Sequence, residues 1–308
     1  MNVFTHNSNH NILLTALTKR REETVERCLR AAERTSRPLV FSHSTALLLL
    51  GAELPDRIAR RARAELHVCS ASQADRPQSA AFIPHLWTAG MDERHPFSGL
   101  TCVGPAVAWA QLAETLTLEE LVVLGDGLMR RDPVLRLAET SDFEALLEGT
   151  ARFRAKDACK LAMRFMRSDT DSSRETLTRL LIERHGLPCP QVNCKVIAEN
   201  GRIMFLDMAY RALRIAIEYQ GTHHDTDLHQ ARMDRAKRDF LRARGWLWLE
   251  PDNRIFLNDD QAAEFIDNLA LLLTQRLGCP IIATPPMTLR QAADGRRTHN
   301  RRNARLSL

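Results

Sequence analysis

Two carboxylates and one amide stand near the ends of two predicted strands in the C-terminal half of the chain. Asp207 ends the strand predicted over 202–208, and Glu218 and Gln220 lie two residues apart at the end of the strand predicted over 213–219. Side chains at i and i+2 of a strand point to the same face, so Glu218 and Gln220 project together, and Asp207 meets them if the strands pair. Converging carboxylates suit Mg²⁺, which proteins bind through carboxylates, water and substrate phosphate. Such an ion can activate water and stabilise charge at a phosphodiester.

Glu218 stands out because its strand, LRIAIEY, is otherwise apolar. A strand of this kind is covered on both faces, and burying a carboxylate there is costly without a cation. Acidic residues at strand ends are also common without any function, so the pattern alone leaves a structural alternative open.

Three further residues near these strands could take part in chemistry. Glu175 follows Ser172 at the spacing of a capping box, so the start of a helix would by itself explain both residues. His223 and His224 form a turn just after the carboxylates. A histidine there could act as a general acid or base or contact phosphate, although two adjacent histidines in a loop could equally be solvated surface.

A charged helix is predicted after this turn, over about 227–244. It carries Asp234, Arg235, Lys237 and Arg238 on a stretch that would overlook the same site. A charged helix face is usually just solvent-exposed, so the three cations are candidates for nucleic-acid contacts rather than established ones.

The hydrophobic patterns predict two domains and a basic tail. In the first, over 1–168, helical spacing dominates, with a short strand at 65–70 and loops and short strands over 76–105. In the second, over 169–278, the predicted order is helix, three strands, helix, strand and helix, with Asn200-Gly201 as a hairpin turn. The chain is therefore expected to be α+β or α/β. The elements expected in the second domain are 173–185, 191–198, 202–208, 213–219, 227–244, 246–250 and 259–277.

Several segments of the second domain resemble the PD-(D/E)XK nuclease superfamily, most closely its very-short-patch-repair endonuclease-like branch. The resemblance covers about 170–275 and is carried by LLIERHGLPCPQVN, LDMAY, AIEYQG, the His-His turn and MDRAKRDFLRARGWLWLE. It implies a three-layer αβββαβ, restriction-endonuclease-like core in a bacterial protein. It also implies cleavage or nicking of DNA that depends on Mg²⁺ or Mn²⁺.

The resemblance implies a role for each candidate. The acid on the family's first helix falls on Glu175, its strand aspartate on Asp207, and its E-x-(K/Q/D) strand on Glu218 and Gln220. Its histidine turn falls on His223 or His224, and its helix aspartate on Asp234. Glu175, Asp207 and Glu218 would then hold the metal, Gln220 would position water, and His224 would assist.

One residue departs from the superfamily pattern. Gln220 stands where a lysine is usual, and a neutral amide can orient water but supplies no charge. Close relatives in this branch also lack the lysine, so activity remains the expectation. The alternative is a nuclease fold that binds DNA or a protein partner without cutting, as a regulator of the defence or antitoxin type.

The first domain resembles the AbiEi-like N-terminal portion that is often fused to this nuclease-like domain. The segments SHSTALLLLG, TCVGPAVAWAQLA and LEELVVLGDGLMRR within 37–165 carry the similarity. It implies a helical accessory domain that recognises nucleic acid or a protein partner.

Charge is concentrated at the C-terminal end. The chain has a formal net charge of +5, and the segment from Arg290 onward, with six arginines and one acid, accounts for all of it. The tail, 279–308, is expected to be disordered, and Arg296, Arg297, Arg301 and Arg302 could contact DNA phosphates. A tail that only solubilises the protein is an equal alternative.

The remaining composition indicates an ordinary globular protein of the cytoplasm. Hydrophobic residues make up 44% and charged residues 26%, and no apolar run reaches the roughly 18 residues that a membrane-spanning helix needs. We see no secretory signal at the start of the sequence. The seven cysteines are scattered and odd in number, which favours reduced thiols. No membrane association is expected.

Overall fold

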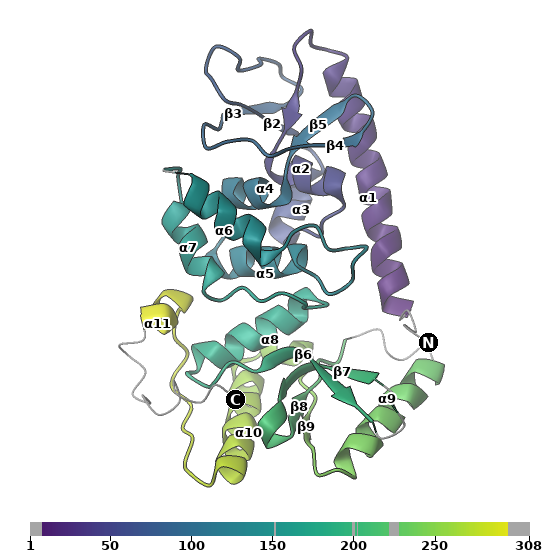
Figure 1. Cartoon of the computed structure of the whole chain (residues 1–308), viewed down its shortest axis with the longest axis vertical. Helices are drawn as coiled ribbons and strands as arrows, with labels where there is room; N and C mark the ends of the chain where they lie inside the picture. The colour runs from purple at the N-terminus through teal and green to yellow at the C-terminus, as the bar shows by residue number, and fades with distance from the viewer. Residues whose placement is uncertain (1–7, 151, 199–200, 202, 222–227, 295–308) are drawn as a thin grey trace. The chain divides into compact units, whose positions relative to one another are not determined.

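A computed structural model describes residues 8–150, 152–198, 201, 203–221 and 228–294. The chain divides into two compact units, one comprising His10–Ser168 and the other beginning at Asp169 (Figure 1). Both contain helices and a mixed β-sheet, so the fold is mixed α and β. No helix in these described ranges is long and apolar enough to cross a membrane.

The first unit combines helices with a five-stranded sheet of order β3-β2-β1-β5-β4. Strand β1 pairs parallel with β5 and antiparallel with β2, and β2 pairs parallel with β3. The helices are α1 (Ser8–Ala32), α2 (His43–Leu50), α3 (Asp56–Ala62), α4 (Pro105–Leu112), α5 (Leu118–Leu128), α6 (Thr140–Gly149) and α7 (Lys156–Met163). The strands are β1 (Val40–Phe41), β2 (His67–Ser70), β3 (Ile83–Leu86), β4 (Glu93–Phe97) and β5 (Leu100–Val103).

This sheet is the main difference from the helical domain expected over 1–168. Of its strands, only the one at 65–70 had a definite counterpart in the sequence patterns. Its strands are two to five residues long, too short to show a clear alternation. Their pairing joins segments that are far apart in the chain, which local patterns do not reveal.

Local contacts fix the helices of the first unit. The Thr117 side chain accepts a hydrogen bond from the Glu120 backbone, and the Glu120 carboxylate accepts one from the Thr117 backbone, so the two residues form a capping box at the start of α5. Trp109 is fully buried and makes an edge contact with Phe143 at a centroid distance of 5.0 Å. Asp126 is also buried and accepts a hydrogen bond from the Arg167 backbone at 2.7 Å.

The second unit follows the predicted order of elements as far as Leu277. It consists of α8 (Ser173–Arg184), β6 (Gln191–Ile197), β7 (Ile203–Tyr210), β8 (Ile215–Ile217), α9 (Leu228–Arg242), β9 (Leu247–Leu249), α10 (Asp259–Leu277) and α11 (Leu289–Asp294). Short 3₁₀ turns lie at Arg211–Leu213 and Asn253–Phe256. The segment 279–294 was expected to belong to a disordered tail, but it is ordered: Met287 and Leu289 are buried, and the Met287 backbone donates to the Arg184 carbonyl, because apolar residues in this segment pack on α8. The sheet has the order β6-β7-β8-β9; only β8 and β9 pair in parallel.

Helices cover both faces of this sheet (Figure 1). Strand β8 shows the alternation that this requires, since Ile215 and Ile217 pack in a cluster with residues of α8 and α10, whereas Ala216 packs in a cluster with Leu241 of α9. The uninterrupted apolar run in β8 therefore reflects burial on both sides, as its sequence predicts.

Two glycines stand at chain reversals, and the first of them belongs to the predicted hairpin turn. Gly201 has φ of +76° in the connection between the antiparallel strands β6 and β7, and its partner in the predicted turn, Asn200, lies outside the described residues. Gly245 has φ of +77° after the end of α9. Glycine adopts this left-handed conformation without steric cost.

Candidate active site

Asp207 and Glu218 come together because β7 and β8 are antiparallel neighbours. Met208 pairs with Ile217, so the same register places Asp207 opposite Glu218, just beyond the end of β8. The Asp207 backbone nitrogen donates to Glu218 Oε1 at 3.1 Å, and the Tyr219 backbone nitrogen donates to Asp207 Oδ2 at 2.9 Å. The Glu218 carboxylate is thus bound by the backbone of Asp207, and the Asp207 carboxylate by the backbone of the residue after Glu218.

Glu175 joins this pair from the N-terminal turn of α8. Its carboxylate accepts hydrogen bonds from the Asp171 backbone at 3.0 Å and from the Ser172 hydroxyl at 2.9 Å. Ser172 also accepts from the Glu175 backbone as the helix N-cap. The capping explanation for the Ser172–Glu175 spacing is therefore correct as far as the serine is concerned.

The burial of Glu175 exceeds what a helix cap requires, with only 6% of the residue exposed. Burial, together with the negative charges of Asp207 and Asp171, raises the pKa of the Glu175 carboxyl well above its usual value. An N-cap partner is normally solvated at the helix surface, whereas Glu175 lies under the influence of a second carboxylate from the sheet. Asp207 acts electrostatically on both Glu175 and Glu218, and these three residues are here called the acid cluster.

Lys237 of α9 is the cation in contact with this cluster. Its Nζ lies 2.9 Å from Glu218 Oε1 and 2.8 Å from Oε2. The pKa of Glu218 is nevertheless raised to about 8, because burial and the Asp207 charge outweigh the effect of Lys237. The ammonium therefore only partly offsets the repulsion among the three acids.

The chemistry of the acid cluster fits a small divalent cation. Crowded, buried carboxylates with raised pKa values need positive charge nearby, and oxygen is the ligand that Mg²⁺ prefers. As they stand, no three His, Cys, Asp or Glu side chains among the described residues are arranged to hold a metal ion. Glu175, Asp207 and Glu218 would hold an ion together only after their side chains rearrange.

Gln220 makes its side-chain contact outside the acid cluster. Its backbone nitrogen donates to the Pro251 carbonyl at 2.8 Å, and its amide donates to Glu250 Oε1 at 2.9 Å. Glu250 also forms an ion pair with Arg238. Glu218 and Gln220 are thus both linked to α9, Glu218 directly through Lys237 and Gln220 through Glu250 and Arg238.

The structure describes only some of the other residues that the sequence predicted for the site. On α9, Arg235 is exposed, Asp234 is half-buried, and Lys237 and Arg238 are both paired with acids. The turn with His223 and His224 lies outside the described residues. So do the tail residues Arg296, Arg297, Arg301 and Arg302.

Sequence reasoning placed Lys237 among the DNA contacts and did not anticipate its bond to Glu218. It also omitted Glu250, although this residue ends the predicted strand WLWLE, and that position was the available signal for it. Asp207 was expected to end its strand, but β7 continues to Tyr210, so Asp207 lies within the strand. No local signal indicated the partner of Lys237, because helix α9 approaches the sheet only in the folded chain.

Three histidines in the first unit form a second cluster of ionisable groups. His67 Nδ1 lies 2.9 Å from His85 Nε2, and the ring centroids of His43 and His85 are 3.9 Å apart. The Glu65 carboxylate lies 3.5 Å from His67 Nε2. Burial is the main cause that lowers the pKa of each imidazole, and for His85 the value falls to about 4. The imidazoles are therefore neutral at neutral pH.

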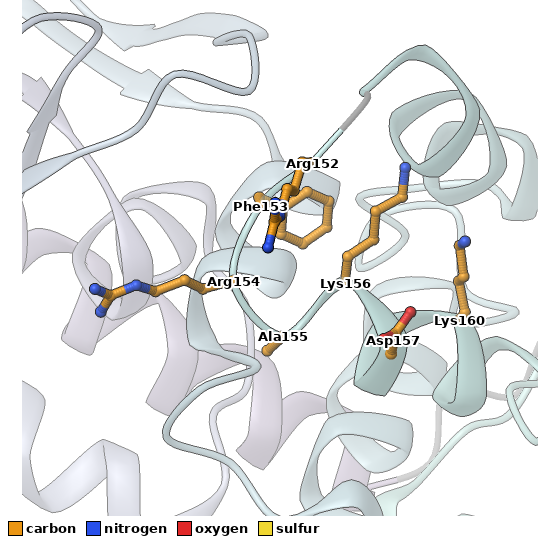
Figure 2. Close-up of a pocket in the computed structure, with 7 residues that line it drawn as sticks. All are labelled: Arg152, Phe153, Arg154, Ala155, Lys156, Asp157 and Lys160. Carbon is orange, nitrogen blue, oxygen red and sulfur yellow. The ribbon is translucent and has the colours of Figure 1, made fainter.

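A basic pocket of about 630 Å³ lies around the start of α7 in the first unit. In Figure 2, Lys156 and Lys160 extend in the same direction from α7, while Arg154 points away from them. Four cationic side chains against one carboxylate make this surface positively charged. Its lining residues are Arg152, Phe153, Arg154, Ala155, Lys156, Asp157 and Lys160.

Comparison with known proteins gives two distant relatives. No family model matches the chain, and no solved structure matches it. The relatives are the uncharacterized proteins MT2308 and Rv2248 of Mycobacterium tuberculosis, from strains CDC 1551 / Oshkosh and ATCC 25618 / H37Rv. Each is 24% identical over 149 residues, which is 48% of this chain and 54% of the relative. The chain thus spans about half the length of the curated relatives it matches.

Proposed function

We propose that the protein is a metal-dependent endonuclease that nicks or cleaves DNA. The observation that supports this proposal is that Asp207 of β7 and Glu218 at the end of β8 are adjacent, and that Asp207 also acts electrostatically on the buried Glu175 of α8. Their burial and the raised pKa values of Glu175 and Glu218 indicate a site short of positive charge. Folding alone does not favour such a cluster, whereas divalent-metal chemistry requires one.

In this proposal the three acids hold Mg²⁺ or Mn²⁺, and the ion supplies activated water and charge stabilisation at the phosphodiester. The chain contributes the positions of the oxygens. Asp207 is fixed by the Tyr219 backbone, and Glu175 by Asp171 and Ser172. His223 or His224 would serve as general acid or base, and Asp234 of α9 would support the site from the helix.

DNA is the proposed partner of the second unit, and a protein or nucleic acid that of the first. Arg235 is exposed on α9 and is available for a phosphate contact. All seven cysteines are free thiols, which is typical of reducing compartments. This supports a cytoplasmic location for the proposed enzyme.

A regulator that binds DNA or a protein without cutting is the alternative. Two observations favour it: Lys237 neutralises part of the acid cluster without any ion, and Gln220 is bound to Glu250. Neither the Lys237–Glu218 contact nor the Gln220–Glu250 contact activates a water molecule for attack on a phosphodiester. If the alternative holds, binding will persist when the acids are replaced, and no strand will be cut.

The deciding experiment is a nicking assay on supercoiled plasmid with Mg²⁺ or Mn²⁺. We expect wild-type protein to nick, and Asp207→Asn to lower the rate by about 10²-fold or more, because loss of groups that merely orient metal ligands already costs about 10–100-fold. Asp267→Asn on the exposed face of α10 removes the same charge and should retain activity. No nicking, or equal nicking by both variants, would contradict the endonuclease proposal.

A further inference from the structure

Lys237 occupies both oxygens of the carboxylate that the proposed function gives to a metal ion. The two Nζ–oxygen distances are 2.8 and 2.9 Å, and the two side chains are only 17% and 14% exposed. A charge-assisted contact of this kind, shielded from solvent, is stronger than a surface ion pair. The ammonium therefore competes for the acid on which an ion would depend.

A divalent ion and the Lys237 ammonium are unfavourable neighbours on Glu218. A carboxylate has lone pairs for more than one partner, but two cations at a short separation in a partly buried site repel each other strongly. An ion that binds Glu218 therefore weakens the Lys237 contact and favours its release. A displaced ammonium needs another anion, because leaving it buried and unpaired is strongly unfavourable.

We propose that Lys237 binds Glu218 in the metal-free protein and transfers to a backbone phosphate of the nucleic acid when the ion binds. The inference rests on the proposed function and adds to it a coupling between ion and substrate. A phosphate is the suitable acceptor because divalent ions in such sites are bound by carboxylates and substrate phosphates together. Lys237 would thereby supply next to the phosphate the positive charge that Gln220, bound to Glu250, does not supply.

The exchange makes ion binding and DNA binding mutually favourable. Without DNA, binding of the ion breaks the Lys237–Glu218 contact, and no phosphate is present to accept the released ammonium. With DNA, the phosphate accepts the ammonium and the ion takes Glu218. Coupling of this kind is reciprocal, so each ligand raises the affinity of the other by the same factor, typically 5–150-fold.

The test measures Mn²⁺ binding to the whole protein without DNA, by the paramagnetic resonance signal of the free ion under anaerobic conditions. The titrations are made at about pH 9, above the raised pKa of Glu218, so that protons compete less with the ion. Lys237→Gln should bind Mn²⁺ at least about tenfold more tightly than wild type, equivalent to 1.4 kcal/mol. Lys237→Arg, which keeps the charge, should resemble wild type.

Arg242→Gln is the matched control. Arg242 is an exposed cation on the same helix, so its loss changes the net charge equally without touching the acid cluster. Its Mn²⁺ affinity should stay within about twofold of wild type, since exposed charges are well screened. Circular dichroism and thermal unfolding confirm that each variant is folded before it is titrated.

A second measurement follows the affinity for a short labelled duplex with uncleavable phosphorothioate linkages. Mn²⁺ should raise the DNA affinity of the wild type by about 5-fold or more, and that of Lys237→Gln by clearly less. Equal Mn²⁺ affinities of wild type and Lys237→Gln without DNA would overturn the exchange, even if the plasmid is nicked. Nicking without Asp207 dependence would instead overturn the proposed function, so the two failures are distinguishable.

Discussion

At the scale of single residues, the acid cluster is a place where stability and the proposed chemistry conflict. Asp207 raises the pKa of both Glu175 and Glu218, so its charge is unfavourable to both neighbours when no cation is bound. Only Lys237 offsets part of this repulsion within the described contacts of Glu218. Sites that keep such repulsion are typically functional rather than structural.

We predict that Asp207→Asn stabilises the metal-free protein while abolishing nicking. The amide keeps an oxygen to accept from the Tyr219 backbone but removes the charge, which should raise the free energy of unfolding by about 1 kcal/mol. Urea unfolding without metal, with Asp267→Asn as the control, measures the change. A clear loss of stability in Asp207→Asn would show that the carboxylate is needed for folding.

The histidine cluster of the first unit predicts a loss of stability in acid. The pKa values of His43, His67 and His85 are lowered in the folded state, so the unfolded chain takes up protons first as the pH falls. The histidines contribute fully to the free energy of unfolding above about pH 6.5, which is the pKa of an unperturbed histidine. This contribution is lost progressively as the pH falls toward about 4, the pKa of His85.

Two charged neighbours modify this titration, Glu65 beside His67 and Arg76 beside His85. Urea unfolding at pH values between about 4 and 8 should show a smaller slope for His85→Gln than for wild type. His95 is exposed on the same sheet, and His95→Gln should leave the slope unchanged. A wild-type slope that His85→Gln does not alter would mean that other groups govern acid stability.

At the scale of elements, the start of α8 serves both folding and the site. Ser172 caps the helix and, through the same hydroxyl, donates to the Glu175 carboxylate. The residue that begins the helix therefore also orients one member of the acid cluster. This dual role explains why the sequence pattern was compatible with both a cap and a catalytic acid.

We predict that Ser172→Ala has two separable effects. Loss of the cap should lower the free energy of unfolding by about 1 kcal/mol, and loss of the hydroxyl bond should weaken Mn²⁺ binding about tenfold. Ser172→Thr keeps the hydroxyl and should restore both. Normal Mn²⁺ binding by Ser172→Ala would show that Glu175 does not depend on this contact.

At the scale of the whole molecule, positive charge lies mainly outside the acid cluster. The basic segment at the C-terminal end carries the net charge, and the first unit adds the pocket with Lys156 and Lys160. The acid cluster itself would repel a polyanion at long range. If the protein binds DNA as proposed, the attraction must therefore come from other parts of the chain.

We predict that truncation after Asp294 weakens DNA binding and its salt dependence. The truncation removes Arg296, Arg297, Arg301, Arg302 and Arg305, and the slope of log affinity against log salt should fall by about 0.9 for every phosphate that these arginines neutralise. Fluorescence anisotropy at several salt concentrations measures both quantities. An unchanged slope would identify the tail as a solubilising segment.

The amino-acid sequence alone determined the order of elements from Ser173 to Leu277, the helix cap at Ser172, and the position of Glu218 at a strand end, whereas β7 continues three residues past Asp207. These features depend on the spacing of residues that are close together in the sequence. Only the tertiary structure brought Lys237 to Glu218, Gln220 to Glu250, and three histidines of the first unit together. It also assembled the five-stranded sheet of the first unit from strands too short to be recognised individually. Such contacts join residues distant in the chain, and they form because whole apolar faces must be buried, a requirement that no short segment expresses by itself.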